Sequence, residues 1–214
     1  MIIGVLQQKG GVGKTTLALN IAAAYAKEGL KVLLVDADPQ GSALTWSSVR
    51  EAPPLFAVVG MPKPTLHKEL PAVAADYDLV IIDGAPQVKE LVRSAILASD
   101  YVLIPVQPSP FDVWSCADIV ALVSEAQQFK PSIAAGFVIN RKIGNTAIGR
   151  DVKKAFGQFP YPLLKTSISQ RVSFAEAAAQ GLTVIETAPS SPAAWEIYEL
   201  TEILKTTTHE RTAA

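Results

Sequence analysis

Short apolar runs alternate along the chain with longer stretches whose apolar residues recur at helical spacing. Five of the short runs are rich in Val, Ile and Leu and contain no alternating polar positions. Such runs are typical of parallel strands that are buried on both faces of a sheet. Strands are therefore predicted at residues 2–6, 31–36, 78–83, 101–106 and 135–140.

The stretches between these runs predict helices. In the first of them, Leu17, Ile21, Ala24 and Tyr25 share one helical face, and Gly29 provides a stop. Further helices are predicted at residues 42–51, 88–97, 113–129, 147–156, 174–180 and about 192–205. Strand–helix alternation on this scale predicts a doubly wound α/β fold, with a mostly parallel sheet, helices on both faces and right-handed crossovers.

The remaining segments set the expected domain boundaries. The proline-rich segment 51–65 is interpreted as a surface connection, because the alternation resumes directly after it. A length of 214 residues is enough for one sizeable core and short for two. We therefore expect a single domain over residues 1–205 and a flexible tail over residues 206–214.

Composition narrows the class of protein. Hydrophobic residues make up 49% of the chain and charged residues 18%, which indicates a compact folded protein. The net charge of −1 gives no overall attraction to nucleic acid or membrane, so a DNA-binding surface would have to be a local patch. The single cysteine, Cys116, excludes an internal disulfide framework. With no charged leader and no apolar run of about 20 residues, we predict a cytoplasmic protein.

A glycine-rich segment, KGGVGKTT at residues 9–16, follows a predicted strand and opens a predicted helix. Its glycines let backbone N–H groups converge on phosphate oxygens, and the helix N-terminus adds partial positive charge. Lys14 is expected to neutralise the β- and γ-phosphates, the Thr15 hydroxyl to bind Mg²⁺, and Thr16 to hold the α-phosphate. The alternative, a turn that binds nothing, is disfavoured by these flanks. The predicted nucleotide-binding residues of this loop are Lys9, Gly10, Gly11, Val12, Gly13, Lys14, Thr15 and Thr16.

Three aspartates follow predicted strands. Asp36 and Asp38 lie in VLLVDADPQG, and Asp83 lies in DLVIIDGAP. Parallel strands end on one edge of the sheet, so all three can face the glycine-rich loop. Asp83 would act on Mg²⁺ through water, Asp36 would support the metal and Asp38 would orient the attacking water. Any one of them could instead cap a helix N-terminus.

The motifs KGGVGKTT, DADPQGSA and VIIDGAP make the sequence resemble the ParA/MinD family of deviant Walker A ATPases. It looks most like the short, ParF-type ParA proteins of plasmid and chromosome partitioning. The resemblance continues through LIPVQPSPFDVWS, VINRK, SQRVSFAEAAAQGLTVIE and SSPAAWEIYEL, so it spans almost the whole chain. It implies a P-loop NTPase fold, ATP and Mg²⁺ as cofactors, and weak ATP hydrolysis that a partner protein stimulates.

The family also implies roles for single residues. Lys9 corresponds to a signature lysine that reaches across an ATP-sandwich homodimer to the other subunit's phosphates; a solvated surface lysine is the alternative. Asp38 corresponds to the aspartate that positions the hydrolytic water, so Lys9, Lys14 and Asp38 are the predicted catalytic residues. Asn140 and Arg141 match a pair that often contacts adenine.

Two surfaces distinguish branches of this family. The final predicted helix places Trp195, Ile197, Leu200 and Leu204 for docking onto the body, and its polar face is acidic, which disfavours membrane binding. A local excess of basic residues favours non-specific contact with DNA phosphates instead. The candidate DNA-binding residues are Lys142, Arg150, Lys153, Lys154, Lys165 and Arg171.

The resemblance therefore implies a dimerising, nucleoid-associated partition ATPase whose cargo is a plasmid or chromosome bound by an adaptor protein. A ParA-like ATPase that positions a protein assembly, such as a chemoreceptor cluster or a microcompartment, remains an alternative. A membrane-cycling MinD-like protein is less favoured. A nitrogenase-reductase-like relative would need cluster-binding cysteines that Cys116 alone does not supply.

Overall fold

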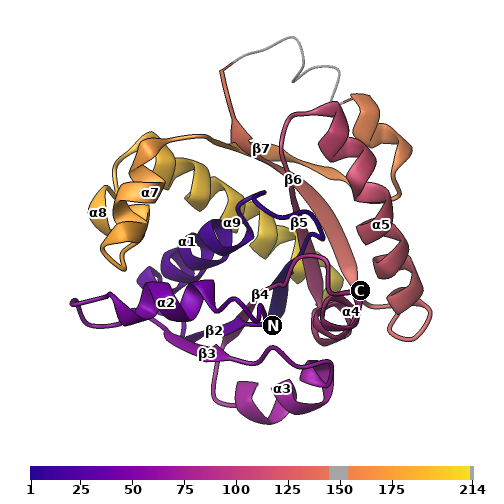
Figure 1. Cartoon of the computed structure of the whole chain (residues 1–214), viewed down its shortest axis with the longest axis horizontal. Coiled ribbons are helices and arrows are strands. Elements are labelled where there is room, and N and C mark those ends of the chain that lie inside the picture. Colours follow the sequence, from indigo (N-terminus) through magenta and orange to yellow (C-terminus); the bar gives the residue numbers. More distant parts are fainter. Residues whose placement is uncertain (145–153, 213–214) are drawn as a thin grey trace.

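A parallel β-sheet of seven strands forms the centre of the computed structural model, which describes residues 1–144 and 154–212 (Figure 1). The strand order is β3-β2-β4-β1-β5-β6-β7, and every neighbouring pair is parallel. This confirms the predicted α/β fold. The strands are β1 Ile2–Val5, β2 Val32–Asp36, β3 Ala57–Gly60, β4 Leu79–Asp83, β5 Tyr101–Val106, β6 Ala134–Lys142 and β7 Leu163–Ser169.

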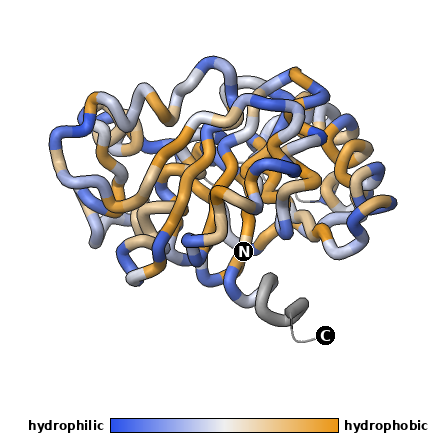
Figure 2. The backbone as a smooth tube through the Cα atoms, turned by 90° about the horizontal axis from the view of Figure 1, so that it is seen from below, coloured by the Kyte–Doolittle hydropathy of each residue, from blue (hydrophilic) through white to orange (hydrophobic). Residues whose placement is uncertain are grey.

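Helices cover both faces of this sheet (Figure 1). One face packs against α1, α2, α7, α8 and α9, and the opposite face packs against α3, α4 and α5. Figure 2 shows the apolar strands running through the middle of the molecule between the two layers. The helices are α1 Lys14–Lys27, α2 Ser42–Ser48, α3 Leu66–Ala74, α4 Lys89–Ala98, α5 Pro110–Gln127, α7 Val172–Ala179, α8 Val184–Thr187 and α9 Pro192–Thr212, with a 3₁₀ turn η1 at Phe156–Gln158.

The five predicted strands are all present, because their residues are buried on both sides. Every residue of β2, β4 and β5 is buried, so an uninterrupted apolar run is the expected pattern for each. The sheet also aligns the strand ends. In the register of the central strands, Asp36 lies opposite Asp83, and Asp83 lies opposite Val5. Two of the predicted acidic residues therefore lie at the edge from which the glycine-rich loop leaves β1.

Two strands were not predicted, and both lie at the margins of the sheet. β3 falls inside the proline-rich segment 51–65, so its interpretation as a plain surface connection is wrong. None of its residues is fully buried, and in β7 buried positions alternate with half-buried or exposed ones. A strand with one covered face lacks the continuous apolar run used for the prediction. The short helices α3, which contains Pro71, and α8 were also missed.

The closing helix differs from its prediction in length and in one contact. α9 continues to Thr212, so residues 206–212, predicted as a tail, extend the helix beyond Lys205. Leu200, Leu204 and Ile197 are fully buried as predicted, whereas Trp195 is 66% exposed, so its predicted docking is wrong.

No helix among the described residues is long and apolar enough to cross a membrane. The helix predicted at 147–156 lies mostly outside the described residues.

Candidate nucleotide site

The loop between β1 and α1 has the backbone geometry that a phosphate-binding loop requires. Gly11 and Gly13 have φ angles of 74° and 89°, a left-handed region that glycine enters without strain. Gly13 occupies the N-cap of α1 and brings no side chain to the first-turn N–H groups. A Cβ atom at Gly13 would collide with the Asn140 amide. The loop therefore presents backbone donors at a helix N-terminus, as an anion site needs.

Lys14 lies inside this loop. Its side chain is buried, and Nζ donates to the Lys9 carbonyl oxygen at 3.2 Å. Burial lowers the pKa of the Lys14 ammonium, although the nearby carboxylates Asp83 and Asp38 oppose this shift. The lysine is thus held at the inner side of the loop, between the backbone and two acidic residues.

Asp83 is a buried carboxylate at the C-terminal end of β4. It is 1% exposed, and neither of its carboxylate oxygens has a hydrogen-bond partner of good geometry among the described residues. The pKa of the Asp83 carboxyl is raised to about 7: burial is the main cause and the charges of Asp36 and Asp38 act in the same direction, while the Thr15 hydroxyl and Lys14 oppose them. Burying an unpaired carboxylate is unfavourable, so a positive charge bound beside Thr15 would relieve this site.

Asp36 and Asp38 are placed differently from each other. Asp36 is fully buried and accepts hydrogen bonds from the backbone N–H groups of Asp38, Ala43 and Leu44, so it holds the start of α2. The contacts of Asp36 therefore match the alternative interpretation, in which it caps a helix N-terminus. A role for Asp36 in metal binding remains a prediction. Asp38 is half-buried, accepts from the Gln40 N–H at 3.0 Å and faces the cavity beside the loop.

That cavity has a volume of about 780 Å³ and lies between the loop and the segment that follows β7. Sequence reasoning assigned only Arg171 from this segment, and assigned it to DNA. In the structure Arg171 lines the cavity and pairs with Glu196 at 2.8 Å. Ligands of doubly wound sheets bind at the carboxyl ends of strands, so recognising β7 would have pointed here. The cavity-lining residues that were missed are Leu17, Ser42, Pro86, Ile168, Ser169, Gln170, Val172, Phe174, Ala175 and Ala178.

Asn140 and Arg141, which are predicted to contact adenine, hold the backbone of the loop in this structure. The buried Asn140 donates its amide to the Val12 carbonyl oxygen at 2.7 Å. Arg141, with a φ of 56°, donates to the Gly11 carbonyl oxygen at 2.9 Å. Gln107, which was not predicted, donates to the same carbonyl at 3.1 Å. Their adenine contact remains a prediction, and their observed role is to fix the loop backbone.

Lys9 is bound within its own chain. Its ammonium nitrogen lies 2.8 Å from Oδ2 of Asp112 in the first turn of α5. The Lys9 side chain is 38% exposed, whereas that of Asp112 is 4% exposed, and Oδ1 of Asp112 has no partner among the described residues. The loop therefore carries two lysines with different surroundings: Lys14 inside it and Lys9 at its outer side, beside a buried carboxylate.

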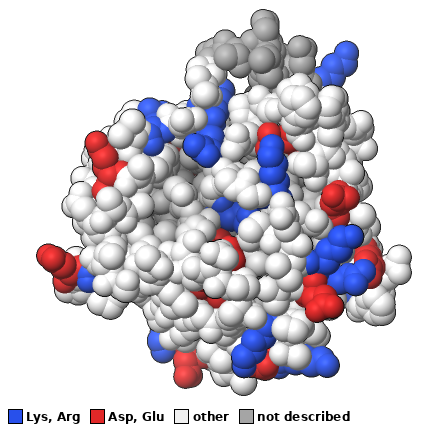
Figure 3. All heavy atoms as spheres, in the orientation of Figure 1, with Lys and Arg blue, Asp and Glu red and all other residues white. Residues whose placement is uncertain are grey.

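The candidate DNA-binding residues are only partly among the described residues. Lys154 and Lys165 are exposed and Lys142 is half-buried, while Arg150 and Lys153 lie outside the described residues. Figure 3 shows Lys and Arg side chains bordering a hollow on the face drawn there. A DNA-binding role for these residues remains a prediction.

The chain is similar to known proteins over most of its length. Residues 3–184 match the family model described as the CobQ/CobB/MinD/ParA nucleotide binding domain. The chain belongs to the ParA/MinD family. This ParA/MinD-type ATPase is 30% identical to the chromosome-partitioning ATPase Soj of Thermus thermophilus, over 94% of this chain and 93% of Soj.

A further relative and one solved structure extend the comparison. It is 29% identical to the maintenance of carboxysome distribution protein A of Halothiobacillus neapolitanus, over 86% of each chain. The septum site-determining protein MinD of Pyrococcus horikoshii, solved in complex with Mg-ADP, shares the fold with a TM-score of 0.77 at 20% identity, over 98% of each chain. Relatives of this ParA/MinD protein thus include both a chromosome-partitioning and a carboxysome-distribution protein.

Proposed function

We propose that this protein is an ATP-dependent dimerising ATPase that binds DNA non-specifically and positions a plasmid or chromosome, with hydrolysis stimulated by a partner protein. The observation that carries this proposal is the pair of lysines on one loop. Lys14 is buried at the inner side of the loop, so its own nucleotide already has a lysine. Lys9, at the outer side, would be available to a nucleotide held by a second subunit once it leaves Asp112.

The described residues fit Mg²⁺ and ATP. Asp83 and Thr15 would hold the metal ion, and the unpartnered, buried carboxylate of Asp83 supports this assignment. No group of three His, Cys, Asp or Glu side chains that could hold a metal occurs among the described residues. Mg²⁺ is usually bound through one or two carboxylates together with substrate phosphates, which fits such a sparse protein site. Bound Mg–ATP would supply the transferable phosphoryl group. The complex of the Pyrococcus horikoshii MinD structure with Mg-ADP supports this choice of ligand.

The protein's own groups would then divide the remaining work. The backbone N–H groups of the loop and Lys14 bind phosphate oxygens and stabilise the charge that develops on them. Asp38, facing the cavity, orients the attacking water. Lys9 from the other subunit adds positive charge where the phosphoryl group leaves, as arginine fingers do in other nucleotide hydrolases.

Dimer formation requires Lys9 to leave Asp112. The 2.8 Å ion pair holds the Lys9 ammonium beside its own α5, so it competes with a second subunit for the same side chain. This competition would make the dimer conditional on bound nucleotide, because the phosphates of the partner subunit offer Lys9 more negative charge than one carboxylate.

A dimer would place the basic residues of two subunits on one assembly. Contacts to DNA phosphates add up and depend on salt, so doubling a modest patch strengthens non-specific binding. Lys142, Lys154 and Lys165, with Arg150 and Lys153, are the candidate contacts, and the protein would then reside in the cytoplasm on the nucleoid. The chromosome-partitioning name of the Soj relative supports this cargo.

The second candidate keeps the chemistry and changes the cargo to a protein assembly. The carboxysome-distribution relative, nearly as similar as Soj, favours this alternative. Capture of bound proteins from the native host separates the two. A small DNA-binding adaptor would support partitioning, and a shell or receptor component would support the second cargo.

The switch is tested by measuring DNA affinity with ATP, with ADP and without nucleotide. Fluorescence anisotropy of a random duplex is expected to show binding at least tenfold tighter with ATP. Lys9→Ala should lose most of this gain. Lys63→Ala, which removes a lysine from an exposed ion pair with Glu69 elsewhere, is the matched control and should keep it. Equal affinity in all three nucleotide states would refute the switch.

A further inference from the structure

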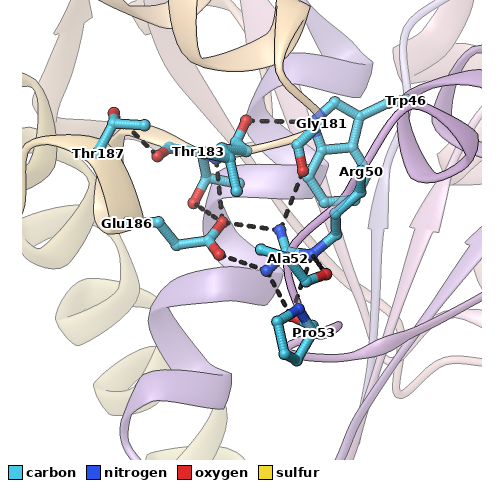
Figure 4. A network of polar contacts seen from close by, with 9 residues as sticks. Trp46, Arg50, Ala52, Pro53, Gly181, Thr183, Glu186 and Thr187 are labelled. Carbon is cyan, nitrogen blue, oxygen red and sulfur yellow. Dashed lines mark hydrogen bonds and ion pairs between the residues drawn. The ribbon is translucent and has the colours of Figure 1, made fainter.

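A buried arginine joins α2 to the turn before α8. Arg50 lies two residues beyond the end of α2, and its side chain is only 6% exposed. Its guanidinium pairs with Glu186 at 2.6 Å and donates to the carbonyl oxygens of Ala52, Pro53 and Gly181 (Figure 4). A planar cation with this many fixed acceptors holds both chain segments in one geometry.

Trp46 of α2 reinforces this junction. Its indole N–H donates to the Leu182 carbonyl oxygen at 3.1 Å, and its ring stacks on Phe56 with centroids 5.7 Å apart. The Arg50 guanidinium lies over the same ring at 5.8 Å. Gly181 has a φ of 65°, and a Cβ atom there would collide with the Arg50 backbone. The end of α2 is therefore in close contact with residues 181–186, which are the turn after α7 and the first residues of α8. We call these contacts the Arg50 clamp.

The clamp joins two segments that continue from opposite walls of the cavity. On one side, Asp38 and Ser42 line the cavity at the start of α2. On the other side, α7 lines it with Phe174 and Ala178. Between α2 and α7 runs a groove of about 350 Å³ that reaches Thr15. α2 and α7 are thus separated by the groove beside the phosphate loop, and the chain segments that follow them come into contact at the clamp.

The two walls depend on the clamp to different extents. The α8 side has a second anchor, because Asn20 of α1 accepts a hydrogen bond from the Val184 N–H at 3.0 Å. α2 has only seven residues, held at its start by Asp36 and at its end by Trp46 and Arg50. Losing Arg50 would therefore release α2 more than α7 or α8, and α2 directly follows the loop that carries Asp38.

We propose that Arg50 is a positioning residue for ATP hydrolysis: by clamping the end of α2 to the α7–α8 turn, it fixes Asp38 against the nucleotide. The inference rests on the proposed ATPase function. Because Arg50 acts through Asp38, its loss should slow turnover while leaving ATP binding by the loop and by α7 intact. A displacement of about 1 Å at a catalytic group can reduce turnover by roughly 100-fold.

Steady-state ATPase kinetics of Arg50→Gln test this assignment. We expect kcat to fall by roughly 10- to 100-fold, with KM for ATP within about twofold of the wild type. In an Asp38→Ala background, Arg50→Gln should reduce the residual turnover little further, since residues that act as a unit are not additive. Arg93→Gln, which breaks an exposed ion pair with Glu125, is the matched control and should leave kcat unchanged.

Hydrogen exchange provides a readout that needs no turnover. In Arg50→Gln, backbone amides of residues 37–49 should exchange faster, with α1 unchanged. Should Arg50→Gln fail to fold, Trp46→Phe is the second variant: it keeps an aromatic ring beside Phe56 but removes the indole donor and part of the ring area. It should shift kcat in the same direction by a smaller factor.

Three outcomes would overturn the proposal. The first is unchanged kcat and exchange in Arg50→Gln, and the second is a raised KM with unchanged kcat. The third is an equal loss of turnover with and without Asp38. Absence of ATP hydrolysis in the wild type would instead overturn the proposed function and this inference with it.

Discussion

Replacing Lys9 by alanine should destabilise the protein far more than replacing its partner Asp112 by asparagine. The two residues form one ion pair at 2.8 Å, but they are not equally exposed: the Lys9 side chain is 38% exposed and that of Asp112 is 4% exposed. Lys9→Ala leaves a buried carboxylate with one oxygen already unpartnered among the described residues. Asp112→Asn removes the buried charge and leaves an ammonium that water can reach.

The expected magnitudes follow from this asymmetry. Removing the partner of a buried charge costs about 3–5 kcal/mol. Solvent already screens the exposed Lys9 end of this pair, so we reduce this cost to about 2–3 kcal/mol for Lys9→Ala. Asp112→Asn should cost about 1 kcal/mol, the value of a typical hydrogen bond. In a chain of this size each kcal/mol lowers Tm by about 2–4 °C.

Urea unfolding of the wild type, both single variants and the double variant measures these terms. The double variant Lys9→Ala/Asp112→Asn should recover most of the stability lost in Lys9→Ala, because it leaves no unpaired buried charge. The reasoning is refuted if Lys9→Ala is as stable as the wild type, or if the double variant is no more stable than Lys9→Ala. The same double variant serves in the DNA-binding assay as a Lys9-free protein without the folding defect.

Two further predictions concern the loop and the closing helix. Gly13→Ala should reduce nucleotide affinity at least tenfold and lower the free energy of unfolding by about 1–3 kcal/mol, because alanine is strained at a φ of 89° and its Cβ atom meets Asn140. Isothermal calorimetry measures the affinity, and urea unfolding measures the stability. Unchanged affinity would contradict the loop geometry. Burial would raise the pKa of the Glu196 carboxyl, but hydrogen bonds from Arg171 and Ser169 outweigh it and hold this pKa below its usual value. The stabilisation that the ionised Glu196 carboxylate contributes is therefore present above the unfolded pKa of about 4.3 and is lost as the pH falls through the folded pKa. Glu196→Gln should make the free energy of unfolding less dependent on pH in this acidic range. An unchanged pH dependence would contradict the assignment.

The central strands could be predicted because their surroundings are uniform. β2, β4 and β5 are buried on both faces, so their residue pattern alone distinguishes them from their neighbours. β3 and β7 lie at the margins of the sheet, where one face of the strand is partly exposed. Their patterns are broken by polar residues, and the missed β7 concealed the cavity wall that follows it.

The candidate site divides in the same way. Gly11, Gly13, Lys14 and Thr15 lie within five consecutive positions, so local backbone geometry and spacing were enough to predict their place in a phosphate loop. Asn140 could be recognised as a site residue by resemblance, but its bond to the Val12 carbonyl oxygen depends on how β6 lies beside the loop. No spacing rule predicts a contact between positions 128 residues apart.

The sequence by itself determined the class of fold, the phosphate loop and the strand-end aspartates, because burial, glycine backbone freedom and parallel strand ends act over short stretches of chain. Tertiary structure alone decided which of these groups are engaged. It assigned Asp36 to the start of α2, left the Asp83 oxygens without a hydrogen bond of good geometry among the described residues, and paired Lys9 with Asp112, 103 positions away. Ion pairs and hydrogen bonds depend on which distant segments the fold brings together, so no short stretch of sequence could reveal them.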